Sequence, residues 1–276
     1  MKKFFLAILV GVLLFVPMVL TGCGSSESGD VEDPLADGTL TIGTHDTYVP
    51  LEYRNDNNEI VGFDIDLGDA ISKELGVDIE WVPTEWDGIF TGLDAKQYDM
   101  ILSGVSLTSE REENFAMTKP YIANGIVIVS STSATPATEA KDLEGQTVGV
   151  QLQTTADIAA QDMKTVDGVD FTLKQFDSAM DAFSALEGQT IDYIIVDQPL
   201  AAFYAAQKPD KYTITSEVLS NEPIAIACRK ENTAFRDQIN DALDTLVDNG
   251  TMAELSEKWF NEDLTQNISD EVKTYE

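Results

Sequence analysis

The chain has 276 residues, of which 43% are hydrophobic, so it can build one large domain or two modest ones with real cores. Its formal net charge is −32 at pH 7, and no basic cluster offsets that charge. A nucleic-acid partner is therefore excluded, and so is electrostatic attachment to an anionic membrane surface.

The first residues have the pattern of a secretory signal. Lys2 and Lys3 precede an apolar run over residues 4–20, and Gly22 and Cys23 follow. This ending resembles the lipobox of bacterial lipoproteins, which implies removal of residues 1–22 and attachment of lipid, palmitate included, at Cys23. A single transmembrane anchor is the alternative, but the run is borderline in length for a span and contains Pro17.

Residues 23–37 are rich in Gly, Ser, Asp and Glu, which is typical of a flexible tether. With a lipid at its start, this tether would hold the folded part at the extracytoplasmic face of the cell membrane.

Strand and helix patterns alternate through the first half of the chain. Strands are predicted over residues 40–44, 77–82 and 100–102, and a hairpin with a polar turn over 51–62. Helices are predicted from an N-cap at Asp64 to Gly76, and from Thr84 through Leu93. The Asp- and Asn-rich hairpin turn lacks the glycine of a calcium loop, so we expect no metal.

The loop at residues 103–111 combines small residues, hydroxyls and one arginine directly after the strand at 100–102. Open α/β sheets bind ligands at the carboxyl ends of their strands. The planar fork of Arg111 suits a carboxylate. A surface loop with an ordinary exposed arginine is the alternative.

The second half repeats this plan. Strands are predicted over 147–150, within 169–176 and over 191–196, with helices over 156–163, 178–188 and 199–206. Leu93 and Asp99 recur 93 residues later as Leu186 and Asp192. This echo favours two lobes of similar α/β design, with mostly parallel sheets and helices on both faces.

Two strand-like segments, 124–130 and 222–228, connect the halves, and two strands that join two lobes make a hinge. We therefore predict one lobe from residues 38–126 with 222–276, which includes two amphipathic helices after residue 230, and a second lobe from 127–221. Cys228 has no cysteine partner in the folded part, so it is expected to be a buried structural thiol.

Seven short segments, taken together in this order, carry a family resemblance. They are residues 43–44 with 48–53, 62–67, 86–89, 103–108 with 110–111, 148–151 with 154–155, 192–197 and 258–260. They resemble the polar amino acid-binding family of bacterial extracytoplasmic solute-binding proteins, the receptors of amino acid ABC importers. The resemblance covers residues 40–260. It implies a two-lobed periplasmic-binding-protein-like fold, the Venus flytrap, that closes on one amino acid. It further implies a permease partner, no cofactor and a monomer.

Carried over by position, the resemblance implies that Arg111 holds the α-carboxylate of the ligand. The Gly104 carbonyl and Ser106 meet its ammonium or carboxylate. Thr154 and Thr155 offer amides to the carboxylate from a helix N-terminus, where the dipole favours an anion.

On the other side of the ligand, the resemblance implies that Asp197 takes the α-ammonium. Tyr48 and Trp86 flank the ligand side chain, with His45 and Gln151 near its end. Many relatives have glycine where this chain has Gln153, so the shape of that loop is open.

Several of these residues also have a purely structural interpretation. Trp86 lies on a predicted helix face that could be core. Asp197 and the Thr154–Thr155 pair could simply cap helices, and His45 could be a solvated loop residue.

Arg111 and Asp197 on opposite walls would hold a zwitterion, and closure would strengthen both contacts by desolvating them. A dehydratase-like enzyme of the same fold and a sensor without transport are the alternatives, but one histidine leaves few catalytic groups. Relatives that bind basic ligands often have an acidic residue at position 45. Because this chain has His45 there, we expect a neutral polar amino acid, although Asp46 and Glu85 lie nearby.

Overall fold

The computed structural model describes residues 33–266, 268, 269 and 271–275. The predicted signal peptide, Cys23 and residues 23–32 of the predicted tether lie outside this range. Leu35 already packs against the core, so ordered structure begins before the predicted end of the tether at residue 37. Within the described residues, no helix is long and apolar enough to cross a membrane.

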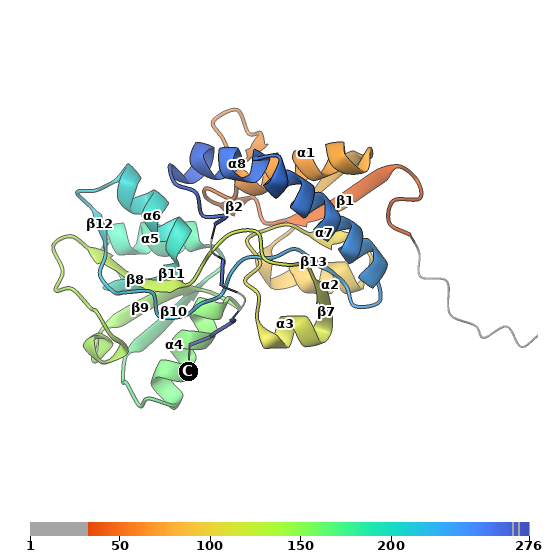
Figure 1. Cartoon of the computed structure of the whole chain (residues 1–276). Helices are drawn as coiled ribbons and strands as arrows, with labels where there is room; N and C mark the ends of the chain where they lie inside the picture. Colours follow the sequence, from red (N-terminus) through yellow and green to blue (C-terminus); the bar gives the residue numbers. More distant parts are fainter. Residues whose placement is uncertain (1–32, 267, 270, 276) are drawn as a thin grey trace, which may run out of the picture. The chain divides into compact units, whose positions relative to one another are not determined.

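Two five-stranded sheets, each covered by helices, form two lobes (Figure 1). The first sheet has the order β5-β1-β6-β13-β7. Its strands are β1 (Thr39–Thr44), β5 (Asp78–Pro83), β6 (Met100–Ile101), β7 (Phe115–Met117) and β13 (Ala227–Arg229). β1 runs parallel to β5 and β6, whereas β13 is antiparallel to both of its neighbours.

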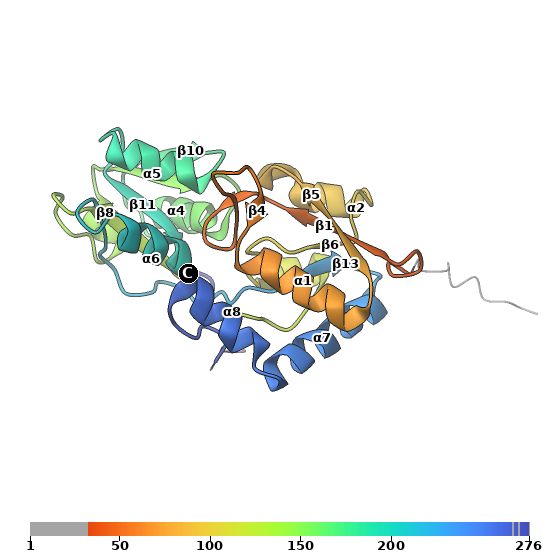
Figure 2. The same ribbon diagram turned by 90° about the horizontal axis from the view of Figure 1, so that it is seen from above.

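Successive side chains of each strand in the first sheet point to opposite faces, and helices cover both faces. Met100 and Cys228 pack into the core shared with α1 (Phe63–Leu75) and α7 (Thr233–Asp248). Ile101 and Ala227 pack on the other face, against α2 (Ile89–Asp94). Figure 2 shows α1 and α7 beside α8 (Thr251–Phe260) on one side of this lobe. A small sheet of β2 (Thr47–Tyr48), β3 (Glu52–Arg54) and β4 (Ile60–Val61) adjoins it.

The second sheet has the order β10-β9-β11-β8-β12. Its strands are β8 (Ile126–Ser131), β9 (Thr147–Gln151), β10 (Thr172–Phe176), β11 (Tyr193–Asp197) and β12 (Tyr212–Ile214). Helix α4 (Thr155–Thr165) covers one face, and α5 (Ala179–Glu187) and α6 (Gln198–Gln207) cover the other. Short elements complete the chain: 3₁₀ turns η1 (Trp86–Gly88) and η2 (Ala140–Leu143), and α3 (Ser109–Asn114).

The predicted echo of the two halves has a structural counterpart. The Asp99 carboxylate accepts a hydrogen bond from the Thr41 amide at 3.0 Å, and the Asp192 carboxylate accepts one from the Thr147 amide at 2.7 Å. Each sheet contains three parallel strands, β1, β5 and β6 in the first and β9, β10 and β11 in the second. Each aspartate lies just before the last of its three strands and binds an amide of the first. The repeat therefore reflects one strand–helix plan used in both lobes.

Two segments cross between the lobes side by side. The Glu222 amide donates to the Asn124 carbonyl at 2.9 Å, and the Ile224 amide donates to the Ile122 carbonyl at 3.0 Å. The end of the chain also touches both lobes. Val272 packs against the first-lobe core cluster that contains Leu107, while the Tyr275 hydroxyl donates to Asp167 of the second lobe at 2.6 Å.

Four sequence-based expectations differ from the structure. Helix α1 has Gly62 as its N-cap, and Asp64 is buried inside the first turn. The helix expected from Thr84 begins as the η1 turn at Trp86. Only Ala227–Arg229 of the 222–228 segment is regular strand, with a bridge at Ile224. Each sheet is mixed, because the strands that carry the crossings return antiparallel to the parallel trio.

Candidate ligand-binding site

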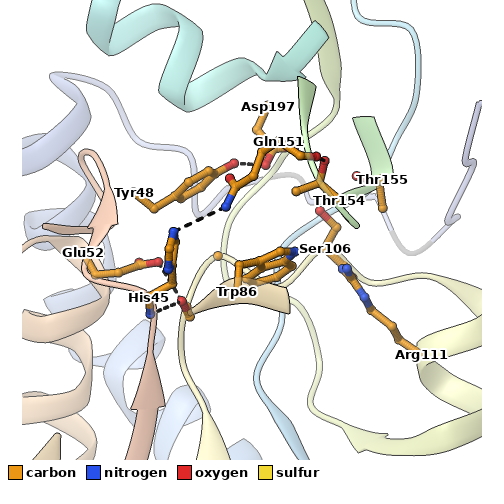
Figure 3. A pocket seen from close by; sticks show the side chains of 12 residues that line it. His45, Tyr48, Glu52, Trp86, Ser106, Arg111, Gln151, Thr154, Thr155 and Asp197 are labelled. Atoms are coloured by element: carbon orange, nitrogen blue, oxygen red, sulfur yellow. Dashed lines mark hydrogen bonds between the residues drawn. The ribbon is translucent and has the colours of Figure 1, made fainter. Parts of the chain in front are cut away.

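An enclosed space lies between the two sheets, at the carboxyl ends of their parallel strands (Figure 3). All ten residues predicted for the site line it, together with two that were not predicted. From the first lobe come His45, Tyr48, Glu52, Trp86, Ser103, Gly104, Ser106 and Arg111, and from the second Gln151, Thr154, Thr155 and Asp197.

Arg111 is the cation of the site. It lies in α3, whose N-cap Thr108 accepts a hydrogen bond from the Arg111 amide at 3.2 Å. One guanidinium nitrogen, Nη1, donates to the Ser106 carbonyl at 2.7 Å, and the Cζ atom lies 5.0 Å from the Phe90 ring centre and 5.6 Å from that of Trp86. Burial lowers the pKa of Arg111 to about 10, against the opposing effect of Asp197 and Glu222, so the guanidinium stays charged at neutral pH.

Asp197 is the anion of the opposite wall. It occupies the N-cap position of α6, but its side chain makes no capping hydrogen bond, so the capping interpretation is wrong. The carboxylate accepts hydrogen bonds from the Tyr48 hydroxyl and, at 2.8 Å, from the Asn124 amide group. Burial raises the pKa of Asp197, while these two donors and the charge of Arg111 oppose the rise.

Three hydrogen bonds link the lobes across the site. Tyr48 of β2 donates to Asp197 of β11, and Trp86 Nε1 donates to the Gln153 carbonyl at 3.2 Å. Gln151 Nε2 lies 3.3 Å from His45 Nε2. Trp86 is therefore both a core residue and a wall of the site, since its ring packs in the first lobe while its N–H reaches the second.

His45 is buried rather than solvated, with 3% of its surface exposed. Its Nδ1 lies 3.3 Å from the Thr84 carbonyl, and its Nε2 lies 2.8 Å from the Thr47 hydroxyl. A neutral ring that carries its proton on Nδ1 donates to Thr84, and the one lone pair of Nε2 is shared between the Thr47 hydroxyl and the Gln151 amide group. Desolvation lowers the pKa of His45, which favours that neutral form.

The N-terminus of α4 faces the site. Thr154 is its N-cap: the hydroxyl accepts from the Asp157 amide at 3.2 Å and donates to the Gln151 carbonyl at 2.8 Å. Capping and exposure of the first helical amides are compatible. Gln153 adopts φ = 60°, the left-handed region that glycine favours, so this loop keeps a glycine-type backbone without the glycine.

The backbone conformation and the close Tyr48 ring both favour glycine at position 104. Its φ is 56°, and a Cβ at this position would lie 3.0 Å from the Tyr48 ring. The Gly104 amide donates to Asp64 Oδ2 at 2.8 Å. Beside it, the Ser103 hydroxyl donates to Glu52 Oε1 at 2.8 Å and accepts from the His45 amide at 2.9 Å.

Sequence reasoning missed three residues of this region: Glu52, Ser103 as a lining residue, and Asn124. Glu52 stands between Leu51 and Tyr53 in the hairpin and has no exposed surface. A charged residue in a strand flanked by large apolar side chains was the available signal. Asn124 lies at the start of a crossing segment, and only the fold brings it to Asp197.

A wider, more open cavity, called the outer cavity below, adjoins the site and shares His45 and Trp86 with it. Its walls are acidic on both lobes, with Glu85 and Asp87 facing Asp177 and Asp181. No lysine or arginine lines this cavity. Within the part of the chain that the structure describes, no group of His, Cys, Asp and Glu is arranged to hold a metal.

Comparison with known proteins gives consistent matches. Residues 40–262 match the model of the bacterial extracellular solute-binding proteins, family 3. The L-cystine-binding protein TcyJ of Escherichia coli is 32% identical over 230 residues, which cover 83% of this chain and 85% of that protein.

Two solved structures share the fold. A variant of the arginine-binding protein of T. maritima has a TM-score of 0.77 and 36% identity, covering 83% of this chain and 98% of its own. An ancestral amino acid-binding protein, described as a precursor of cyclohexadienyl dehydratase, has a TM-score of 0.76 and 32% identity, covering 82% and 97%.

Proposed function

Because the chain belongs to the bacterial extracellular solute-binding proteins, family 3, we propose that it binds a polar amino acid between its lobes and delivers it to an ABC importer. The observation that carries this proposal is the pair of opposite charges on facing walls. Arg111 comes from the first lobe and Asp197 from the second, and both line one enclosed space. An α-amino acid carries a carboxylate and an ammonium on one carbon, which suits a cation and an anion on facing walls.

In the proposed complex, Arg111 pairs with the α-carboxylate, and the first amides of α4 approach the same group. Asp197 accepts the α-ammonium, which takes the place of the Tyr48 hydroxyl on that carboxylate. Closure then depends on the ligand, since each charged end bridges from one lobe toward the other. A ligand shifts the lobes toward closure only by its greater affinity for the closed arrangement.

The ligand side chain is proposed to point toward His45, Gln151 and the outer cavity. The four carboxyl groups of that cavity favour a side chain with a cationic far end. Two of the matching proteins are named for L-cystine and arginine. The far end of arginine is a cation, and the far end of cystine carries an ammonium beside its carboxylate. We therefore place these two ligands first, in place of the neutral polar amino acid expected from the sequence.

Thermal shift against the twenty amino acids and L-cystine tests the proposal. A ligand at 100 times its dissociation constant should stabilise the protein by about 2.7 kcal/mol, which is a readily measured rise in Tm. If no amino acid raises the Tm, the protein is not an amino acid receptor. Size-exclusion chromatography with light scattering tests the expected monomer.

A receptor of this kind is proposed to be lipid-anchored at Cys23, outside the cytoplasm. The support is the sequence pattern at residues 2–23. Cys23→Ser in the full-length precursor should move the protein from the membrane fraction to the medium or periplasm. Continued membrane association of the variant would favour a transmembrane anchor instead.

An enzyme is the second candidate, because one matching structure is described as a precursor of a dehydratase. Arg111, Asp197 and Glu52 are the ionisable groups such a reaction would use. Incubation with the amino acid that gives the largest thermal shift, followed by mass spectrometry, distinguishes the two. Recovery of the unchanged amino acid supports the receptor, whereas turnover supports the enzyme.

A further inference from the structure

Two buried carboxyl groups lie next to each other at the candidate site, one of them in its wall, with no basic partner. Glu52 of β3 and Asp64 of α1 both have no exposed surface. Their side chains are within hydrogen-bonding reach of each other. Among the described residues, neither forms an ion pair with a lysine, arginine or histidine.

Two ionised carboxylates cannot share a buried site without a counter-charge, so the pair must hold a proton. The hydrogen-bond partners decide where it lies. Asp64 accepts from the Gly104 amide at 2.8 Å and from the Tyr121 hydroxyl at 2.8 and 2.9 Å. Donors favour the charged form of an acceptor, so Asp64 is the anion.

Glu52 has the complementary environment. Its Oε1 accepts from the Ser103 hydroxyl, while its Oε2 is buried and has no other partner among the described residues. A proton on Oε2 would donate to Asp64 and satisfy both atoms. Burial is the largest cause that raises the pKa of Glu52 well above its ordinary value, with the charge of Asp64 next, whereas the pKa of Asp64 rises only to about 7.

We propose that Glu52 is the protonated member of this pair and acts as a positioning residue for the Ser103–Gly104 turn. Through Ser103 it fixes the amide of His45, and through Asp64 it fixes the amide of Gly104. Both anchored residues line the candidate site. The shared proton thus fixes the backbone of Ser103 and Gly104, the turn that leads along the chain to Ser106 and Arg111. The consequence for ligand affinity rests on the proposed function, but the position of the proton does not.

The test compares Glu52→Gln, Glu52→Ala and Asp64→Asn. Glutamine keeps an acceptor for Ser103 and a neutral donor for Asp64, so Glu52→Gln should retain most of the Tm that Glu52→Ala loses. Asp64→Asn offers fewer acceptor positions to three donors and should be severely destabilised. Ligand affinity should follow the same order, with Glu52→Gln at least tenfold tighter than Glu52→Ala.

The pH dependence of folding stability separates the proposed proton from a purely packing role of Glu52, because packing alone would not change it. The unfolded Glu52 carboxyl loses its proton near its ordinary pKa, whereas the folded one keeps it, so raising the pH favours unfolding of the wild type. Relative to Glu52→Gln, the wild-type folding equilibrium constant should fall about tenfold per pH unit above that value. Asp46, Tyr48 and Tyr121 also face the pair. They are unchanged in the variant, so the comparison of the two proteins isolates the effect of Glu52.

Infrared difference spectra of wild type minus Glu52→Gln, recorded at neutral pH without ligand, should contain the carbonyl band of a protonated carboxylic acid. Glu59→Gln, on the exposed end of the same hairpin, is the matched control and should give no such band and no change in the pH profile. Absence of the band in the Glu52 difference overturns the proposal, as does a flat stability difference across pH. These readouts need no ligand, so their failure is separate from failure of the proposed function, which thermal shift tests.

Discussion

Replacement of Arg111 by alanine is the sharpest test of how the site holds a ligand. Arg111 is the cation that lines the enclosed space, and its guanidinium is stacked near Trp86 and Phe90. Only the Nη1 bond to Ser106 is made within the described part of the protein, so most of the fork remains available to a carboxylate. Its pKa of about 10 keeps it charged at pH 7.

The expected loss follows from that environment. Truncating one partner of a buried, hydrogen-bonded charge pair costs about 2–5 kcal/mol of binding free energy. At about 1.4 kcal/mol for each factor of ten, Arg111→Ala should weaken binding roughly 30-fold to several thousand-fold. Arg111→Lys keeps the charge but loses the planar fork, so its affinity should fall between those of the wild type and Arg111→Ala.

Isothermal titration calorimetry with the best thermal-shift ligand measures these affinities. Arg236→Ala is the matched control, because Arg236 also lies in the first lobe and donates to a carbonyl, that of Met117, at 3.1 Å, but does not line the enclosed space. Its affinity should equal that of the wild type. If Arg111→Ala binds within about threefold of the wild type, the guanidinium does not hold the carboxylate, and the proposed orientation of the ligand is wrong.

Three further substitutions address the second lobe and the closure of the site. Asp197→Asn should weaken binding by about 1.5–3 kcal/mol, as titration calorimetry would measure. Because burial raises the pKa of Asp197, wild-type affinity should fall on mild acidification, as protonation removes the charge, while that of the variant stays level. Trp86→Phe removes the donor to the Gln153 carbonyl and should cost about 1 kcal/mol, a roughly fivefold weaker affinity; unchanged affinity would show that this contact does not stabilise the bound form. Gln153→Gly relieves a left-handed backbone and should raise the Tm, since that conformation costs a non-glycine residue about 1 kcal/mol or more; a lower Tm would contradict this account of the loop.

Much of the fold could be predicted, because strands and helices each have a characteristic local pattern of apolar residues. Buried strands are short apolar runs, and helices such as Thr233–Asp248 place apolar residues on one face. The repeat of Asp99 as Asp192 correctly indicated two lobes of one design. Mixed pairing was not predictable, because strand direction depends on which distant segment returns to the sheet edge.

The candidate site likewise has a part that could be predicted from the sequence and a part that could not. Ten lining residues could be assigned from the sequence, because the family resemblance carries their positions over to this chain. Whether Asp197 caps a helix or faces a cavity could not be predicted, because both need an aspartate at a strand end. The structure shows that Asp197 faces the cavity, where its carboxylate accepts a hydrogen bond from Tyr48, 149 positions away in the sequence.

The sequence by itself thus determined the order of the elements from local patterns, and the family and most of the site residues from the resemblance of short segments. Only the tertiary structure decided the state of the charges. It buried Glu52 against Asp64 without a cation, stacked Arg111 near two rings, and gathered carboxylates from both lobes at the outer cavity. A carboxyl group keeps or loses its proton according to its neighbours in space, and those neighbours come from segments far apart in the chain.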